Sequence, residues 1–224
     1  MDIRTILTCA LLLLPAACKN DGAGSKGADS ARTIPAYVDA AIADRGRALQ
    51  RVDDAKRKPA EIITFSGVKP GDKLLELIPG EGYWTRILSK IAGPKGHVYA
   101  VWPQGYARFS EAKVALVTTM SHQPAYANVS VEVQPTPVLS APEPLDLVFT
   151  SQNYHDYPAE FMGNNDPAIL NDAVFKMLKP GGTYIVIDHV AAPGTTLAQT
   201  RELHRIDPAM VKQQVAKAGF EFCR

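Results

Sequence analysis

Short apolar runs alternate with amphipathic segments along most of the chain. Runs typical of buried parallel strands occur, in order, at 73–78, 97–102, 129–133, 145–150, 183–188 and 220–224. Segments with helical spacing, opened by Pro or Asp-Pro signals and closed by Gly, predict helices over 34–42, 59–66, 83–92, 108–120, 167–178 and 208–218. This alternation predicts an α/β fold: a mostly parallel sheet with helices on both faces and a ligand site at the carboxyl ends of the strands.

The first residues are expected to lie outside this domain. Residues 1–18 contain a four-leucine run at 11–14, which is too short to span a bilayer but suits a signal-peptide core. The run ends in Pro-Ala-Ala-Cys, so Cys18 resembles the acylated cysteine of a bacterial lipobox; a plain signal peptide is the alternative. Residues 19–33 read as a flexible tether before a domain over 34–224. We therefore expect an exported protein, either periplasmic or a membrane-anchored lipoprotein.

Composition narrows the classes of function. The 224 residues, 46% of them hydrophobic and 21% charged, suffice for one domain with a core. With a net charge of +1, the chain lacks the excess of positive charge that is typical of nucleic-acid-binding proteins. Membrane contact is expected only through a lipid at Cys18. The three cysteines form no disulfide framework, and the five histidines are scattered, so no metal site is expected.

The segment LLELIPGEGYW at 74–84 carries the strongest chemical signal. A predicted strand containing Glu76 passes through a loop into a predicted helix. Gly80 and Gly82 permit positive φ and a close approach of a ligand to the backbone, and the first amides of the helix point into the same space. The dinucleotide fingerprint G-x-G-x-x-G is absent.

This segment resembles the first motif of class I S-adenosylmethionine-dependent methyltransferases, in which an acidic residue is followed by three alternating glycines. Glu76, Gly80 and Gly82 match the pattern, whereas Ile78 stands at the first glycine position. The resemblance implies that S-adenosylmethionine contacts Glu76, Gly80 and Gly82, together with the adjacent Pro79 and Tyr83.

Further segments extend the resemblance over about 59–220. LDLVF at 145–149 resembles the fourth strand of the family, and MLKPGG at 177–182 resembles the turn that enters its fifth. The chain also resembles bacterial exported proteins and lipoproteins described only as predicted methyltransferases. The implied fold is a Rossmann-like methyltransferase sheet. That family's sheet ends in an antiparallel strand pair, for which 220–224 supplies only a stub, so we expect a C-terminally truncated chain with an open sheet edge.

Two positions bear on the proposed ligands. The strand at 97–102 ends in Trp102, where the family places an acid for the ribose hydroxyls; Trp102 is a candidate to stack on adenine, or else a core or lid residue. After the fourth strand, the resemblance implies a loop that faces the methyl acceptor, in which Asn153 and Tyr154 are candidates to orient the acceptor or the sulfonium. His155 is a candidate general base there, or else a hydrogen-bonded loop histidine.

The sequence thus predicts an S-adenosylmethionine-dependent methyltransferase whose acceptor it does not identify, with a small molecule favoured over a macromolecule. The alternative is a non-catalytic exported binding module that keeps the methyltransferase fold. It is favoured by Ile78, by the missing ribose acid and by the export signal. A nicotinamide-dependent oxidoreductase is disfavoured by the missing fingerprint.

Overall fold

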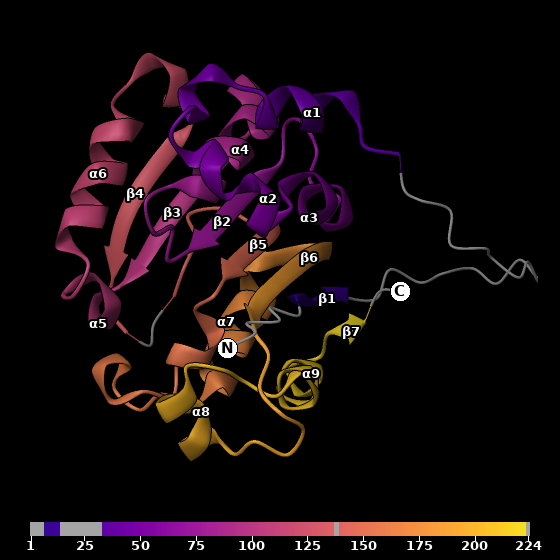
Figure 1. Ribbon diagram of the computed structural model, residues 1–224, viewed down its shortest axis with the longest axis vertical. Helices are drawn as coiled ribbons and strands as arrows, with labels where there is room; N and C mark the ends of the chain where they lie inside the picture. Colours follow the sequence, from indigo (N-terminus) through magenta and orange to yellow (C-terminus); the bar gives the residue numbers. More distant parts are fainter. Residues whose placement is uncertain (1–6, 14–32, 137–138, 223–224) are drawn as a thin grey trace, which may run out of the picture.

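The computed structural model describes residues 7–13, 33–136 and 139–222 and contains a seven-stranded sheet (Figure 1). The order across the sheet is β4-β3-β2-β5-β6-β1-β7. The strands are β1 (Leu7–Leu13), β2 (Lys73–Leu77), β3 (His97–Pro103), β4 (Val129–Gln134), β5 (Leu145–Ser151), β6 (Leu178–His189) and β7 (Glu221–Phe222). The five strands from β2 to β6 pair in parallel, as the sequence predicts.

The strand order reverses between β2 and β5. From β2 the chain continues through β3 to β4 on one side, then returns to β5 and β6 on the other. In open parallel sheets the loops that leave two such strands diverge and leave a crevice at the carboxyl ends. The loop after β2 and the loop after β5 therefore face each other across a cleft.

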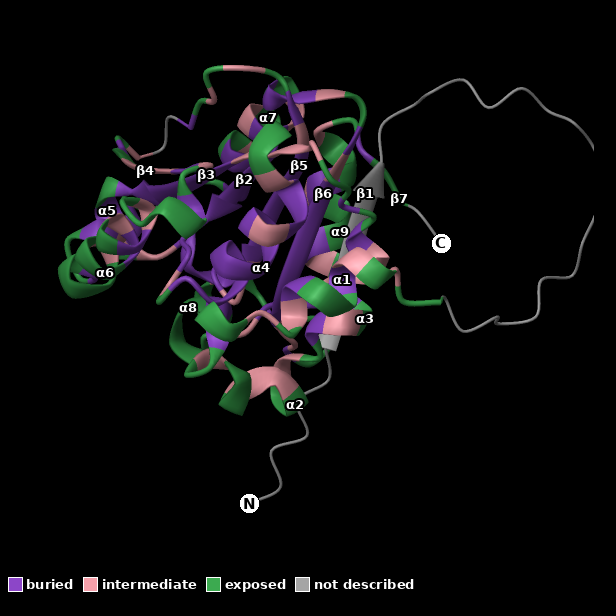
Figure 2. Cartoon of the chain, turned by 90° about the horizontal axis from the view of Figure 1, so that it is seen from above, coloured by how far each residue is buried: buried purple, intermediate pink, exposed green. Residues whose placement is uncertain are grey.

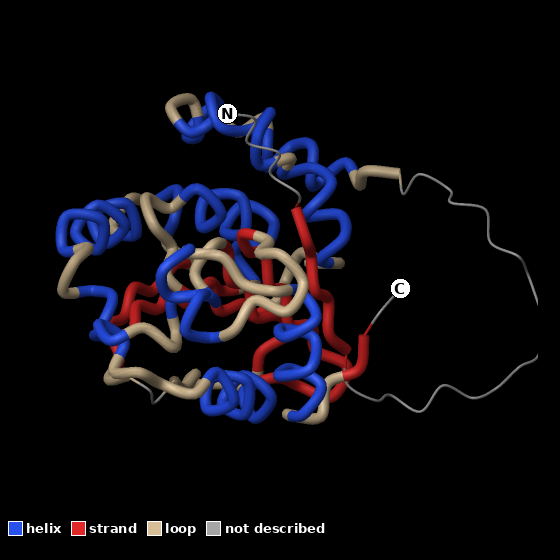
Figure 3. The backbone as a smooth tube through the Cα atoms, turned by 60° about the horizontal axis from the view of Figure 1, so that its bottom comes forward, coloured by secondary structure: helices blue, strands red, loops and turns tan. Residues whose placement is uncertain are grey.

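Helices cover both faces of the sheet (Figure 3). They are α1 (Ala36–Ile42), α2 (Asp54–Arg57), α3 (Pro59–Ser66), α4 (Tyr83–Ala92), α5 (Gln104–Ala107), α6 (Glu111–Ser121), α7 (Pro167–Met177), α8 (Leu197–Leu203) and α9 (Pro208–Lys217). One apolar cluster joins α1, α3, α4 and α6 to the sheet, and a second joins α7 and α9 to it. The central strands β2, β3 and β5 between them are almost wholly buried (Figure 2).

The predicted elements agree closely with those observed, with additions. The expected helix over 108–120 begins at Glu111, because a separate short helix, α5, precedes it. The hydrophobic pattern does not predict α2 or α8, and β6 begins earlier than expected, at Leu178. The additions matter because α2 and the end of α8 both reach the cleft.

The edge beyond β6 differs from the expectation. Leu7–Leu13, expected to lie outside the fold, pairs antiparallel with β6 from Thr183 to His189. The Glu221–Phe222 stub then pairs with β1. The physical reason is that the edge of β6 presents unpaired backbone donors and acceptors, which an added strand satisfies. The edge is therefore occupied rather than open.

Several expectations concern residues outside the described ranges. The candidate lipobox at Cys18 and all but the last position of the tether at 19–33 lie there. Within the part of the chain that the structure describes, no helix has the length and apolarity needed to cross a bilayer.

Candidate functional site

A cleft of about 1100 Å³ lies at the carboxyl ends of β2 and β5, where the strand order reverses. Its walls come from the loop after β2, the loop after β5, the segment between α1 and α3, and the α5–α6 connection. Ligand pockets commonly have volumes of roughly 300–1,000 Å³. The cleft is therefore large enough to hold two small molecules side by side.

The loop after β2 is shaped by its two glycines. Gly80 has a φ of +61° and lines the cleft, and no protein atom lies within 4 Å of the position of a Cβ there. A side chain at Gly80 would project into space that a ligand can use. Gly82, with a φ of +75°, faces the protein instead, since a Cβ would lie 2.9 Å from Nη1 of Arg86 and 3.4 Å from Val117.

Arg86, which the sequence analysis did not single out, holds this loop in place. Its Nη1 donates to the carbonyls of Glu81 at 2.8 Å and Gly82 at 2.9 Å. The residue is almost fully buried and lines the cleft. Because Arg86 belongs to the first turn of α4, these two hydrogen bonds fix the shape of the loop relative to that helix.

Ile78 occupies the first glycine position in a glycine-like conformation. Its φ is +56°, a value that costs a β-branched residue roughly 1–2 kcal/mol. Across the cleft, Gln152 after β5 also has a positive φ, +64°. The two strand ends that form the cleft thus both turn through the left-handed region, and such conformations concentrate at functional sites.

Glu76 lies at the floor of the cleft, 2% exposed. Burial raises the pKa of its carboxyl to about 8, and the hydrogen bond from Thr85, at 2.5 Å, opposes part of that rise. A cation beside this carboxyl would lower its pKa and stabilise the ionised form. Glu76 is therefore placed to accept an ammonium group.

Tyr83, at the start of α4, contacts the segment between α1 and α3 that lines the cleft. Its hydroxyl donates to Asp54 at 2.6 Å, and the guanidinium of the fully buried Arg47 pairs with the same carboxylate at 2.7 Å. The guanidinium of Arg57 also lies over the Tyr83 ring, 4.7 Å from its centroid. The hydroxyl of Tyr83 is thus engaged by the protein, and its ring forms part of the wall.

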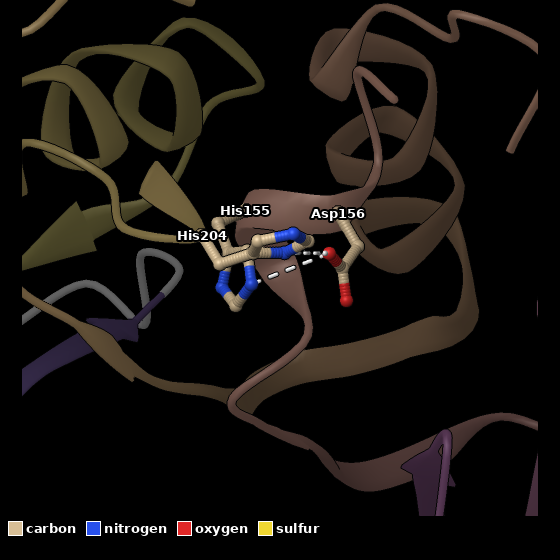
Figure 4. A group of neighbouring side chains, drawn as sticks. All are labelled: His155, Asp156 and His204. Carbon is tan, nitrogen blue, oxygen red and sulfur yellow. Dashed lines mark ion pairs between the residues drawn. The ribbon is translucent and has the colours of Figure 1, made fainter. Parts of the chain in front are cut away.

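A cluster of histidines and carboxylates forms the opposite wall. Nδ1 of His155 lies 2.6 Å from Asp188, whose other oxygen accepts the His155 backbone N–H at 2.8 Å. Nε2 of His155 lies 3.2 Å from Asp156. His204 approaches the same oxygen of Asp156 at 3.4 Å, and Figure 4 shows His155, Asp156 and His204 together. With Asp188, four side chains from three segments converge.

These carboxylates determine the protonation of His155. Burial lowers the pKa of His155, but the hydrogen bonds and charges of Asp156 and Asp188 outweigh it and raise the pKa to about 9. The imidazole therefore carries a proton on both nitrogens at neutral pH. Of the two interpretations of His155, this position agrees with the hydrogen-bonded loop histidine, because an imidazole protonated between two carboxylates accepts no further proton.

The other residues proposed at this wall separate into two groups. Asn153 lines the cleft, and its amide donates to the carbonyls of Ser151 at 2.6 Å and Ile78 at 3.3 Å, which links the two loops. Tyr154 is fully buried away from the cleft, with its hydroxyl bonded to Gln214 and Asn171. Tyr154 is therefore a core residue and does not face an acceptor.

Trp102 is also fully buried, in the apolar cluster beneath α7, and does not line the cleft. An indole with no exposed surface offers no face for an adenine ring, so of the two interpretations the core role describes its position. The cleft wall near the end of β3 is formed by Tyr106, Phe109, Ser110 and Lys113, and none of these four carries a carboxylate. Glu76, Pro79 and Tyr83 do line the cleft as expected.

His204, and His189 as a residue of the cleft wall, were not predicted from sequence. His204 follows α8 in the HRIDP segment, and its φ of +49° marks an abrupt end of that helix. In the sequence, His155 and His189 follow two predicted strands, whereas the helix before His204 was not predicted. Their convergence depends on β5, β6 and α8 ending at one edge, which corrects the expectation that the histidines are scattered.

Comparisons with known proteins identify the fold. No family model and no curated protein matches the chain. Among solved structures, an S-adenosylmethionine-dependent methyltransferase from Aquifex aeolicus matches with a TM-score of 0.57 at 22% identity, covering 79% of this chain and 88% of that one. An arsenic(III) S-adenosylmethionine methyltransferase from Chlamydomonas reinhardtii matches at 0.56 and 19% identity, covering 83% and 62%.

A third solved structure, a putative sarcosine dimethylglycine methyltransferase from Galdieria sulphuraria, matches at 0.55 and 14% identity, covering 84% of this chain and 65% of that one. The chain thus spans less than two thirds of the length of the second and third neighbours. The protein has a Rossmann-like methyltransferase fold, with helices around a mostly parallel sheet.

Proposed function

We propose that the protein is an S-adenosylmethionine-dependent methyltransferase acting on a small molecule. The observation that carries the proposal is the position of the Gly80 loop: it lies at the reversal of strand order, with open space beyond Gly80 and the buried Glu76 beneath. The fold shared with three methyltransferases supports it.

The residues present fit the cofactor's chemical groups. The backbone at Gly80 allows close approach of the amino-acid part, and Glu76 is available to its ammonium group. Arg57, whose side chain is partly exposed beside the cleft, supplies a cation for its carboxylate. Ser110 and Lys113, which line the cleft near the end of β3, would supply hydrogen-bond donors for the ribose hydroxyls. The cofactor supplies an electrophilic methyl group on a sulfonium.

The acceptor is proposed to have an apolar body and a polar head. The outer rim of the cleft bears Leu49, Val52 and Phe109, which are 84%, 83% and 73% exposed. The inner end holds the histidine and carboxylate cluster. In methyl transfer, the alignment of donor and acceptor lowers the barrier most, and both ends of this cleft contribute to alignment.

Calorimetric titration with S-adenosylmethionine, S-adenosylhomocysteine and NAD tests the cofactor. We expect saturable binding of the first two and none of NAD. Mass spectrometry for S-adenosylhomocysteine, with panels of hydroxyl, thiol and amine acceptors, then separates an enzyme from a binding module. Failure of both S-adenosyl compounds to bind would contradict the proposal, and binding without turnover across the panels would favour the non-catalytic alternative.

We also propose that the chain is exported, with 1–18 as a leader and Cys18 as a lipid-bearing residue. The four-leucine run and the Pro-Ala-Ala-Cys sequence support this. Removal of the leader would remove β1 from the edge of β6, so a chain beginning at residue 19 should self-associate in sedimentation experiments. Fractionation and intact mass test the export itself: full-length protein with an unprocessed N-terminus in the cytoplasm would contradict it, and Cys18→Ser should abolish membrane retention.

A further inference from the structure

Three side chains at the inner end of the cleft, His155, Asp156 and His204, point toward one another. One oxygen of Asp156 lies 3.2 Å from Nε2 of His155 and 3.4 Å from Nδ1 of His204. All three potential ligand atoms lie within 4.8 Å of one another. Figure 4 shows both imidazoles directed at the same carboxylate, although they come from the loop after β5 and the end of α8.

These separations match those of ligands around one metal ion. With bonds of about 2.0–2.1 Å, neighbouring ligand atoms of a tetrahedral zinc site lie about 3.3 Å apart. The third pair, Nε2 of His155 and Nδ1 of His204, lies within 4.8 Å. A small movement of the exposed His204 would bring these two nitrogens to the same spacing. We propose that His155, Asp156 and His204 bind one divalent first-row transition-metal ion at the inner end of the cleft.

The second carboxylate of the cluster supports this assignment. Asp188 holds Nδ1 of His155 at 2.6 Å, which leaves Nε2 directed at the shared point. Asp188 is itself fixed by the backbone N–H groups of His155 and His189, at 2.8 and 2.7 Å. A carboxylate on the far nitrogen is the usual companion of a histidine that ligates a metal, because it sets the ring orientation and raises ligand basicity.

The ligand types define the class of ion. Two imidazoles and one carboxylate suit zinc, iron(II), cobalt or nickel, whereas magnesium and calcium prefer an all-oxygen shell. A bound ion takes the place of the proton that now joins His155 to Asp156. Because His204 is 67% exposed on the cleft side, the remaining coordination positions face the cleft.

The position of the site suggests its use. The ion would hold an oxygen, sulfur or nitrogen atom of a molecule in the cleft and lower the pKa of a hydroxyl or thiol bound to it. That use rests on the proposed function. Binding of the ion does not, since none of its three ligands belongs to the Gly80 loop.

The test is a titration of the chelator-treated full chain, without an affinity tag, with Co²⁺ and Zn²⁺ alone. Cys9, Cys18 and Cys223 are replaced by Ser so that no thiolate competes. We expect one ion per chain, visible absorption of bound Co²⁺, and its displacement by Zn²⁺. His204→Ala, at an exposed position, should weaken binding by roughly tenfold or more, and Asp188→Asn by roughly 10–100-fold through the orientation of His155.

His189→Ala is the matched control. The ring of His189 lies 5.8 Å from that of His155, nearly the same as the 5.7 Å for His204, yet His189 is not among the convergent ligands. Its replacement should leave affinity unchanged. Absence of saturable binding in the parent chain, or equal affinity in the parent and His204→Ala, would overturn the site. An equal loss in His189→Ala and His204→Ala would overturn the ligand assignment.

Discussion

The two walls of the cleft are built in different ways. The wall after β2 is made of residues within one strand–loop–helix unit, and its shape comes from positive φ values and from Arg86 bound to the carbonyls of its own loop. The opposite wall brings together His155, Asp188 and His204 from three separated segments, and buried charged hydrogen bonds hold it. The first wall depends on local backbone geometry, and the second depends on the whole sheet being in place.

This difference predicts which substitutions affect binding and which affect folding. Changes in the glycine loop should alter ligand affinity in a protein that still folds. Changes in the histidine wall should alter stability as well, because removing one member leaves another charge buried without its partner.

The largest expected effect is loss of cofactor binding in Gly80→Val. The side chain would occupy the open space beyond Gly80, so calorimetry should detect no S-adenosylhomocysteine binding. Gly67→Val is the matched control: Gly67 has a φ of +70° and open space around it, but it lies on the surface at the end of α3, away from the cleft. Unchanged affinity in folded Gly80→Val, or an equal loss in Gly67→Val, would show that the site is misassigned.

The next largest effect is on stability, in Asp188→Asn. Removing this charge leaves the buried His155 imidazolium with Asp156 alone, and breaking a buried pair costs about 3 kcal/mol. Denaturant unfolding measures the change. Glu61→Gln, which breaks the exposed pair with Lys58, should cost under about 0.5 kcal/mol. A loss no larger than that control would mean that the histidine wall is not held by its charges.

A third effect concerns the pH dependence of stability in Glu76→Gln. The pKa of Glu76 is raised from an unfolded value of 4.5 to about 8, so the folded state favours the protonated form. Stability from this group is fully present below pH 4.5, falls as the pH rises towards 8, and is constant above. Between pH 5 and pH 9, the melting temperature of Glu76→Gln should therefore fall by less than that of the parent. If the melting temperatures of the two proteins changed equally with pH, the raised pKa of Glu76 would be contradicted.

The smallest expected effect is a gain of stability in Gln152→Gly. Glycine adopts the observed φ of +64° without the left-handed penalty of about 1–2 kcal/mol, and its greater freedom in the unfolded chain offsets part of that. We expect a net gain of about 0.5–1 kcal/mol in denaturant unfolding. A net loss would indicate that the Gln152 side chain contributes contacts that outweigh the strain.

Much of the fold and one wall of the cleft could be predicted from sequence, because their signals are local. The apolar runs at β2, β3, β4 and β5 and the Pro and Asp-Pro helix starts gave bounds close to those observed. The order of strand, glycine loop and helix placed Glu76 and Gly80 together, since chain connectivity brings them within reach. Ile78 shows how far this holds: its position was recognised from the motif, but its positive φ appears only in the structure.

Tertiary structure alone decided the rest. Trp102 and Tyr154 have the side chains of a binding site, yet which face of an element points inward depends on what packs against it, and both are buried in the core. The pairing of Leu7–Leu13 with β6 joins segments from opposite ends of the chain, which no local pattern encodes. The convergence of His155 and His204 has the same cause, because it requires β5, β6 and α8 to end at one edge of the sheet. Sequence determines where each segment bends and which residue stands at the bend, whereas packing determines which of those residues meet.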